Sequence, residues 1–205
     1  MKDYKEEFDE IAISADPHFG HANIIGLCNR PFQTITEHDN TIVQRHNERV
    51  SENALYINLG DLGFRCSPWY ISKKIRELNF KKMIVLLGNH DKPLRQAVKK
   101  GMLDDLLNDG SLEVVGGRTA IEDQSLITAK MMEIGNQRVI IGHYSYRSWP
   151  NAFRNSWHLF GHSHSNLDPY YRSFDVGVDT NDYYPYKWEE IVEKMAKIQE
   201  GFSES

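Results

Sequence analysis

Five short polar motifs occur along this chain, each after an apolar run, and each carries a side chain that can bind a metal ion. In chain order they are Asp16-Pro17-His18, Gly60-Asp61, Gly88-Asn89-His90-Asp91, Gly142-His143 and Gly161-His162-Ser163-His164. Carboxylate, amide and imidazole groups together suit Mn²⁺, Fe, Zn²⁺ and similar ions, and no motif holds a thiolate that would favour structural zinc. The ligands exceed the needs of one ion with open positions, so the set predicts two ions that share one carboxylate.

The apolar runs before these motifs predict the elements that position them. Buried strands are expected over 11–15, 54–59, 83–87, 138–141 and 157–160. Helices are expected over 37–50 with Thr36 as N-cap, over 68–78 with Ser67 as N-cap and Pro68 at the first position, and over 92–102. Alternating strands and helices predict a largely parallel sheet, whose ligands bind beyond the carboxyl ends of the strands.

The second half of the chain predicts a different sheet. Strands are expected over 112–115, 119–127, 131–134 and 137–141, separated by the turn pairs Gly116-Gly117 and Gly135-Asn136. That pattern favours hairpins and a more antiparallel sheet. A further strand over 174–178 and an amphipathic helix over 187–199 follow. We therefore expect one domain over residues 1–205, an α/β two-sheet sandwich flanked by helices.

Composition excludes several classes of function. The 205 residues carry a formal net charge of −5, which argues against nonspecific binding to nucleic acid. Cys28 and Cys66 lie outside any paired motif, so we expect no disulfide framework and a cytoplasmic location. The N-terminal residues lack the apolar core of a signal peptide, and no apolar run reaches the ~18 residues of a membrane helix. We expect no membrane partner, and the sequence leaves the oligomeric state open.

Taken together and in this order, the motifs resemble the calcineurin-like metallophosphoesterases over residues 11–180. The opening segment, DPHFGHANII at 16–25, is similar to a small bacterial and phage branch of that family. The resemblance implies the two-sheet metallophosphoesterase fold and hydrolysis of a small phosphorylated substrate, such as a nucleotide. It also implies two divalent metal ions as cofactors, with Mn favoured and Fe, Zn, Ni or Co as alternatives.

The same resemblance implies a role for each motif side chain. One ion is expected on Asp16, His18 and His164. The other is expected on Asn89, His143 and His162, with Asp61 as the bridge between the two. His90 is implied to be catalytic, and Asp91 beside it is implied to orient or charge it.

Two ions about 3.5–4 Å apart can hold a shared hydroxide, because metal binding lowers the pKa of water toward ~7. We expect this hydroxide to attack phosphorus in line while His90 assists the leaving group. Phosphodiesters are favoured as substrates. The alternatives are a phosphomonoesterase, a nucleotide pyrophosphohydrolase, or a metal-binding scaffold without catalysis. The presence of His90 and all seven ligands favours an enzyme over a scaffold.

Other polar residues near the motifs offer contacts to substrate. The candidates are His21, Arg30, Arg65 and Arg147, because an imidazole on the loop of His18 or a guanidinium can reach phosphate oxygens. His21 suits a structural role equally well. His38, His46 and His158 lie outside the motifs and are expected to be surface or packing residues.

Overall fold

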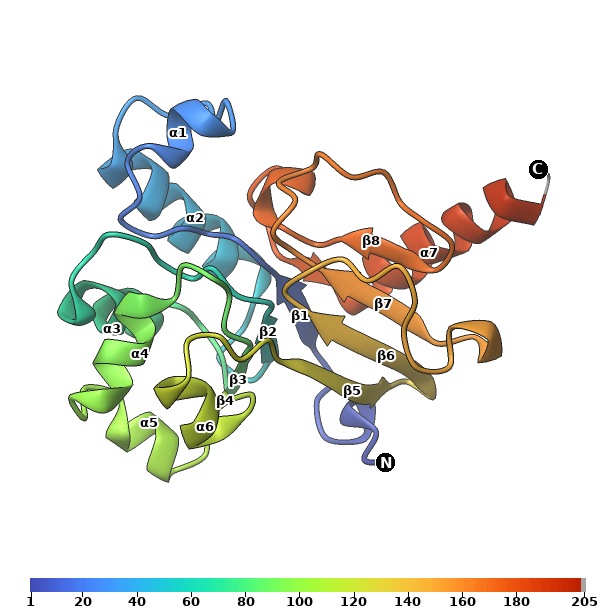
Figure 1. Ribbon diagram of the computed structural model, residues 1–205, viewed down its shortest axis with the longest axis horizontal. Coiled ribbons are helices and arrows are strands. Elements are labelled where there is room, and N and C mark those ends of the chain that lie inside the picture. The colour runs from blue at the N-terminus through green and yellow to red at the C-terminus, as the bar shows by residue number, and fades with distance from the viewer. Residues whose placement is uncertain (204–205) are drawn as a thin grey trace.

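Two β-sheets pack face to face in this protein, with helices outside them (Figure 1). The computed structural model describes the backbone of residues 1–203. The first sheet has the order β4-β3-β2-β1-β9 and the second has the order β5-β6-β7-β8. The first contains β1 (Ile11–Ser14), β2 (Leu55–Asn58), β3 (Lys82–Val85), β4 (Leu112–Val114) and β9 (Tyr186–Lys187). The second contains β5 (Ala129–Ile134), β6 (Gln137–Gly142), β7 (Trp157–Phe160) and β8 (Ser173–Asp175).

Both sheets are mixed. In the first, β1 to β4 are parallel and only β9 runs antiparallel, beside β1. In the second, β5 and β6 form an antiparallel hairpin, whereas β6, β7 and β8 are parallel. The helices are α1 (Ile24–Leu27), α2 (Ile35–Arg49), α3 (Pro68–Glu77), α4 (Lys92–Lys99), α5 (Asp104–Asn108), α6 (Gly117–Glu122) and α7 (Trp188–Ser203), with 3₁₀ turns at Tyr4–Glu6, Ala152–Arg154 and Val178–Thr180. The fold is thus mixed α/β, with two mixed sheets flanked by helices.

Alternate side chains of the first sheet enter two different cores. In β1, Ile11 and Ile13 enter the core between the sheets, whereas Ala12 faces α2, α3 and α4. This division follows from strand geometry, because successive side chains point to opposite faces. Val139 of β6 and Leu159 of β7 complete the inner core, to which α7 also contributes. A sheet covered on both faces holds its strand ends rigidly, and those ends carry the motifs.

The strands predicted before the five motifs are confirmed to within two residues at each end. The helix predicted over 68–78 is also confirmed, and the Ser67 hydroxyl accepts the Tyr70 N–H at 3.1 Å. The preceding helix begins earlier than predicted: Thr34, not Thr36, is the N-cap, and it accepts the Glu37 N–H at 3.1 Å. The helix predicted over 92–102 ends at 99, and α7 begins at 188.

Three expectations for the second half were wrong. β4 pairs with β3 in the first sheet and forms no hairpin with its successor. The strand expected over 119–127 is the short helix α6 followed by a loop, because Gly116 takes a left-handed φ of 82° and turns the chain. The second sheet is less antiparallel than expected, since only the Gly135-Asn136 turn closes a hairpin in it. No helix in the described part of the chain combines the length and apolar character needed to cross a membrane.

Candidate metal centre

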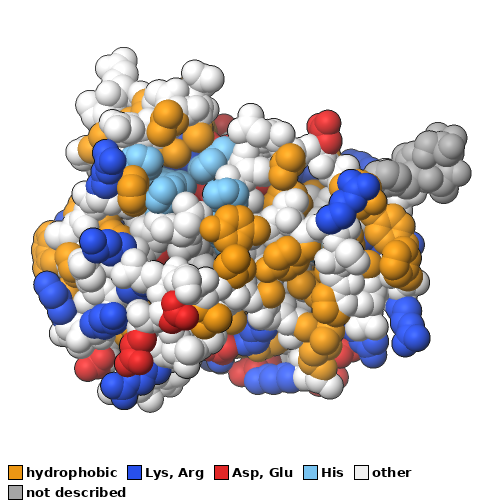
Figure 2. All heavy atoms as spheres, in the orientation of Figure 1, with side chains coloured by type: hydrophobic (Ala, Val, Ile, Leu, Met, Phe, Trp, Pro, Cys, Tyr) orange, Lys and Arg blue, Asp and Glu red, His pale blue; other side chains and the backbone are white. Residues whose placement is uncertain are grey.

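The five motifs meet at one place on the molecular surface. β1, β2 and β3 are parallel neighbours, as are β6 and β7, so the loops after these strands emerge at common edges. Figure 2 shows histidine side chains gathered there in a single cluster. The prediction that the motif side chains lie beyond strand ends is therefore confirmed.

The backbone of the motifs is strained. Left-handed φ angles between 48° and 68° occur at Asp16, His18, Asp61, His162 and His164. Such angles cost a non-glycine residue ~1–3 kcal/mol, and they concentrate at functional sites. The chain turns sharply at both Asp16 and His18. The loops are tied together by backbone bonds, among them the His18 N–H to the Asp61 carbonyl at 3.1 Å.

Two motif positions must be glycine, because an acidic side chain of a neighbouring loop lies against each of them. A Cβ atom at Gly88 would collide with the carboxylate of Asp61. A Cβ atom at Gly161 would lie 2.6 Å from Oδ2 of Asp16. Real Cβ contacts are essentially never that short, so any side chain here would displace a carboxylate of the site. These glycines let the acidic side chains lie against the neighbouring loop.

Asp16, His18 and His164 form the first ligand group, with one donor atom from each within 4.8 Å of the others. Asp16 and His18 are fully buried, yet Asp16 Oδ1 and His18 Nε2 have no hydrogen-bond partner. Buried polar atoms are nearly always partnered, so an orphaned oxygen and nitrogen side by side need an explanation. A cation between them would satisfy both.

Asp61, His143 and His162 form the second group, again with donor atoms within 4.8 Å of one another. The Nδ1–H of His143 donates to the Leu59 carbonyl at 2.9 Å, which leaves its Nε2 atom directed into the site. The Asn89 side-chain oxygen lies 3.0 Å from that nitrogen. The second set predicted from the sequence is therefore also brought together.

Asp61 lies between the two groups. Its Oδ2 atom is 3.5 Å from Nε2 of His18 and 3.5 Å from Nε2 of His143. Its other oxygen, Oδ1, accepts the backbone N–H of His90 at 2.8 Å, which fixes the carboxylate plane. One oxygen equidistant from two imidazoles of different groups is the arrangement that a bridging ligand requires.

Two neighbouring side chains fix the orientation of the histidine rings. His21 Nδ1 lies 3.2 Å from Nδ1 of His18, so it holds that ring with Nε2 facing the site. Asp179 accepts the Nδ1–H of His164 at 2.8 Å, which leaves Nε2 of His164 free. Metal-ligating histidines almost always have such a partner on the other nitrogen. Asp179 was missed in the sequence, because only the chain fold brings it to His164.

Arg30 does not serve as a phosphate clamp, and that prediction was wrong. Its buried guanidinium forms a bidentate pair with Asp179, with N–O distances of 2.8 and 2.7 Å. The remaining N–H groups go to the backbone carbonyls of Asp16 and Pro17 and to the ring of His38. All five donors are engaged, so none is left for a substrate.

Asp91 has a different role from the one predicted. Its carboxylate accepts the backbone N–H groups of Asp61, Leu62 and Gly88, each at 2.8 Å. It therefore ties the loop after β2 to the loop after β3 and is not directed at the His90 ring. His90 instead packs against Phe64, with ring centroids 4.1 Å apart.

Electrostatics in the centre favours an added cation. Burial raises the pKa of Asp16 to about 7, and burial lowers the pKa of His18 to about 2. For His143, burial opposes protonation, but the adjacent Asp61 carboxylate outweighs it and raises the pKa to about 9. His143 therefore carries a proton at neutral pH where a metal ion would otherwise lie, and a divalent ion would replace that charge.

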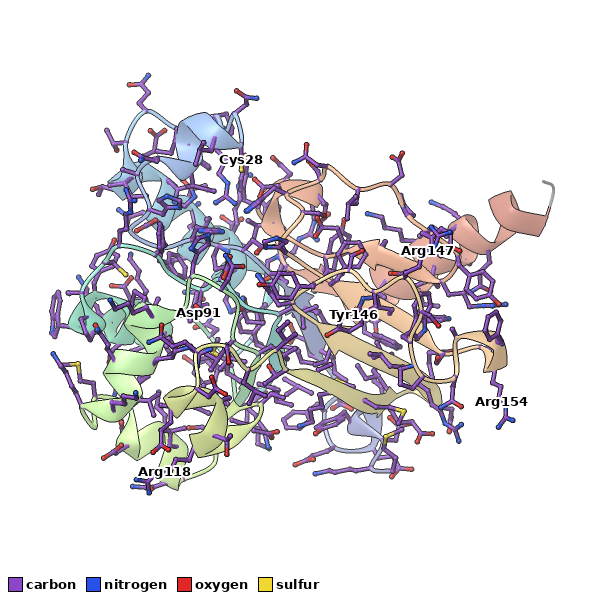
Figure 3. All side chains as sticks on the ribbon, in the orientation of Figure 1. Cys28, Asp91, Arg118, Tyr146, Arg147 and Arg154 are labelled. Atoms are coloured by element: carbon purple, nitrogen blue, oxygen red, sulfur yellow. The ribbon has the colours of Figure 1, made fainter. Side chains whose placement is uncertain are left out.

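The remaining predicted residues lie apart from the two groups. Arg147 has its guanidinium 4.8 Å from the Tyr170 ring centroid, over the second sheet (Figure 3). Its contact with substrate stays a prediction. His38, His46 and His158 are buried, as expected of packing residues. His158, for example, donates from Nδ1 to the Ile140 carbonyl and accepts the Tyr146 N–H at Nε2.

Comparisons of sequence and of structure find proteins that are similar to this chain. No protein-family model matches the sequence. The uncharacterized protein MJ1445 of Methanocaldococcus jannaschii is 25% identical over 195 residues, which cover 92% of this chain and 92% of that protein. The crystal structure of AQ665, a protein of unknown function from Aquifex aeolicus, matches with a TM-score of 0.64 and 20% identity over 90% of this chain and 98% of that one. The likeness to AQ665 shows a shared fold.

Proposed function

We propose that this protein is a calcineurin-like metallophosphoesterase that uses two divalent metal ions to hydrolyse phosphate esters, with phosphodiesters favoured. The observation that carries the proposal is the position of Asp61, whose Oδ2 lies 3.5 Å from an imidazole nitrogen of each ligand group. Two ligand groups joined by one carboxylate describe a binuclear site, which suits attack on phosphorus.

The donor set fits two ions, with Mn²⁺ favoured. Asp16, His18 and His164 would hold one ion, and Asn89, His143 and His162 the other, with Asp61 between them. The orphaned Asp16 Oδ1 and His18 Nε2 support this assignment independently of any likeness. When bound, the ions would lower the pKa of a water molecule and withdraw negative charge from the phosphoryl oxygens.

His90 is the side chain we assign to the leaving group. Its backbone is anchored to Asp61, and its half-buried ring makes no side-chain hydrogen bond within the described part of the chain. The imidazole is therefore available to donate a proton to the departing oxygen. General acid catalysis of this kind contributes ~10²–10⁴-fold.

Hydrolysis of bis-nitrophenyl phosphate tests the proposal. We expect turnover with added Mn²⁺, complete loss with EDTA, and recovery when Mn²⁺ is restored. Monoesterase or pyrophosphohydrolase activity would instead show as preference for nitrophenyl phosphate or a nucleoside triphosphate. If no phosphate ester of these kinds is hydrolysed in a chelator-sensitive way, a metal-binding scaffold without catalysis becomes the better account.

A further inference from the structure

A surface cavity of about 440 Å³ lies next to His90 and is not used by the two ligand groups. Its lining residues are Phe64, Arg65, Cys66, Lys92, Pro93 and Gln96. The Phe64 ring contacts the His90 ring on one side, at 4.1 Å between centroids, and has the Arg65 guanidinium 5.2 Å from its centroid. A single aromatic ring therefore separates the cavity's arginine from the proposed proton donor.

The cavity is cationic. Arg65 and Lys92 are both exposed, and neither forms an ion pair with any residue that the structure describes. No acidic side chain lines the cavity, although acidic residues outnumber basic ones in the chain. Figure 2 shows basic side chains bordering the histidine cluster on this face. One wall is also the first turn of α4, and a helix N-terminus favours an anion.

We propose that this cavity receives the leaving group of the substrate, and that this leaving group carries a second phosphate bound by Arg65 and Lys92. The inference rests on the proposed function, since His90 marks the leaving-group side. A guanidinium binds phosphate oxygens bidentately, and an ammonium adds a point charge. Phe64 and Pro93 supply an apolar wall for a sugar or base, and the volume falls in the range of pockets that hold a nucleotide-sized molecule.

In the reaction, the water oxygen bonds to phosphorus and the phosphorus–oxygen bond to the leaving nucleotide breaks. The departing oxygen takes a proton from His90, the attacking water releases one proton to solvent, and His90 regains its proton from solvent. The products are a phosphate monoester and a phosphorylated alcohol. The substrate class is thus a phosphodiester between two nucleosides, of which the departing one has a phosphate of its own.

Three dinucleotides test the assignment: d(ApT), d(ApTp) and d(pApT). The last two carry the same extra charge on opposite nucleosides, and the products identify which nucleoside leaves. We expect kcat/KM to be highest for the dinucleotide whose extra phosphate is on the departing nucleoside, by about tenfold over d(ApT). Equal rates, or preference for the phosphate on the retained nucleoside, would overturn the assignment.

Substitutions identify the residues that cause the preference for the extra phosphate. Arg65→Gln and Lys92→Gln should each reduce the preference severalfold, whereas Arg118→Gln, an exposed arginine on α6 (Figure 3), should keep it. Calorimetric titration of the three dinucleotides in EDTA measures the same preference without turnover. If nothing is hydrolysed, the proposed function fails. The calorimetry still decides the cavity: tighter binding of one phosphorylated dinucleotide than of d(ApT), abolished by Arg65→Gln, supports it, and equal affinities of all three dinucleotides overturn it.

Discussion

Asp179 accepts the Nδ1–H of His164 at 2.8 Å, and the same carboxylate accepts two N–H groups of Arg30. The first ligand group is therefore supported by an ion pair that is itself buried. This pairing fixes which nitrogen of His164 faces the site, because Nδ1 is already used. It also gives Arg30, which is adjacent to the site, a structural rather than a substrate-binding role.

Asp179→Asn should weaken Mn²⁺ binding by about 10–100-fold, the usual cost of losing the partner of a metal-ligating histidine. The Asn side chain has no negative charge, so its oxygen binds the Nδ1–H of His164 more weakly and orients the ring less firmly. Titration calorimetry with Mn²⁺ measures the change. Asp182→Asn is the matched control, because Asp182 is exposed and pairs with Arg45 at the surface. Equal affinities in the wild type and Asp179→Asn would contradict this role.

Arg30→Gln should destabilise the fold and leave the buried Asp179 carboxylate without its guanidinium. Breaking one side of a buried ion pair costs ~3–5 kcal/mol of unfolding free energy. Urea denaturation of the metal-free protein measures that loss. A variant with wild-type stability and a raised KM for phosphate esters would restore Arg30 as a substrate ligand.

Metal binding should release protons and should tighten as pH rises from 6 to 9. Asp16 and His143 have folded-state pKa values raised to about 7 and about 9, so both hold protons at the lower pH that a metal ion must displace. Raising the pH removes those protons first, and the apparent affinity increases. Calorimetry in buffers of different ionisation enthalpy counts the protons released. Affinity that does not change over this range would contradict the protonated state of the metal-free site.

Stability of the metal-free protein should fall as pH drops from 6.5 toward 4. Burial lowers the pKa of His158 to about 4. In the folded protein its Nε2 already accepts the Tyr146 N–H. Below pH 6.5 the unfolded chain binds a proton that the folded chain excludes, which costs about 1.4 kcal/mol per pH unit. Chemical denaturation across this range tests the slope. His158→Gln should be less stable at pH 8 and show a shallower slope, and an unchanged slope would assign the acid sensitivity elsewhere.

Local sequence was sufficient to locate the strands of the parallel sheet and the loops after them. The run from 11 to 15 is apolar and ends at Asp16, and the strand and its loop follow from that alone. The segment 119–127 was mispredicted because the spacing of its apolar residues is compatible with a helix as well as with a strand. The left-handed turn at Gly116 directs the chain into a short helix. Short apolar runs leave helix and strand ambiguous.

Tertiary contacts account for what the sequence could not predict in the site. Asp91 follows His90 directly, yet its side chain turns to the backbone of Asp61 and Gly88, a pairing between two loops. Asp179 lies in a 3₁₀ turn after β8, and nothing in its sequence neighbourhood links it to His164. Ligand types could be predicted from composition and spacing, whereas the partners that orient them depend on chain packing.

The number of metal ions held by the wild type and by Asp61→Ala tests the central claim most directly. Asp61 Oδ2 lies 3.5 Å from imidazole nitrogens of both ligand groups, so its loss should affect both ions. Metal analysis after equilibration with Mn²⁺ and gel filtration should give two ions per wild-type chain and almost none in the variant. One ion per wild-type chain, or two retained by Asp61→Ala, would contradict a binuclear centre bridged by Asp61.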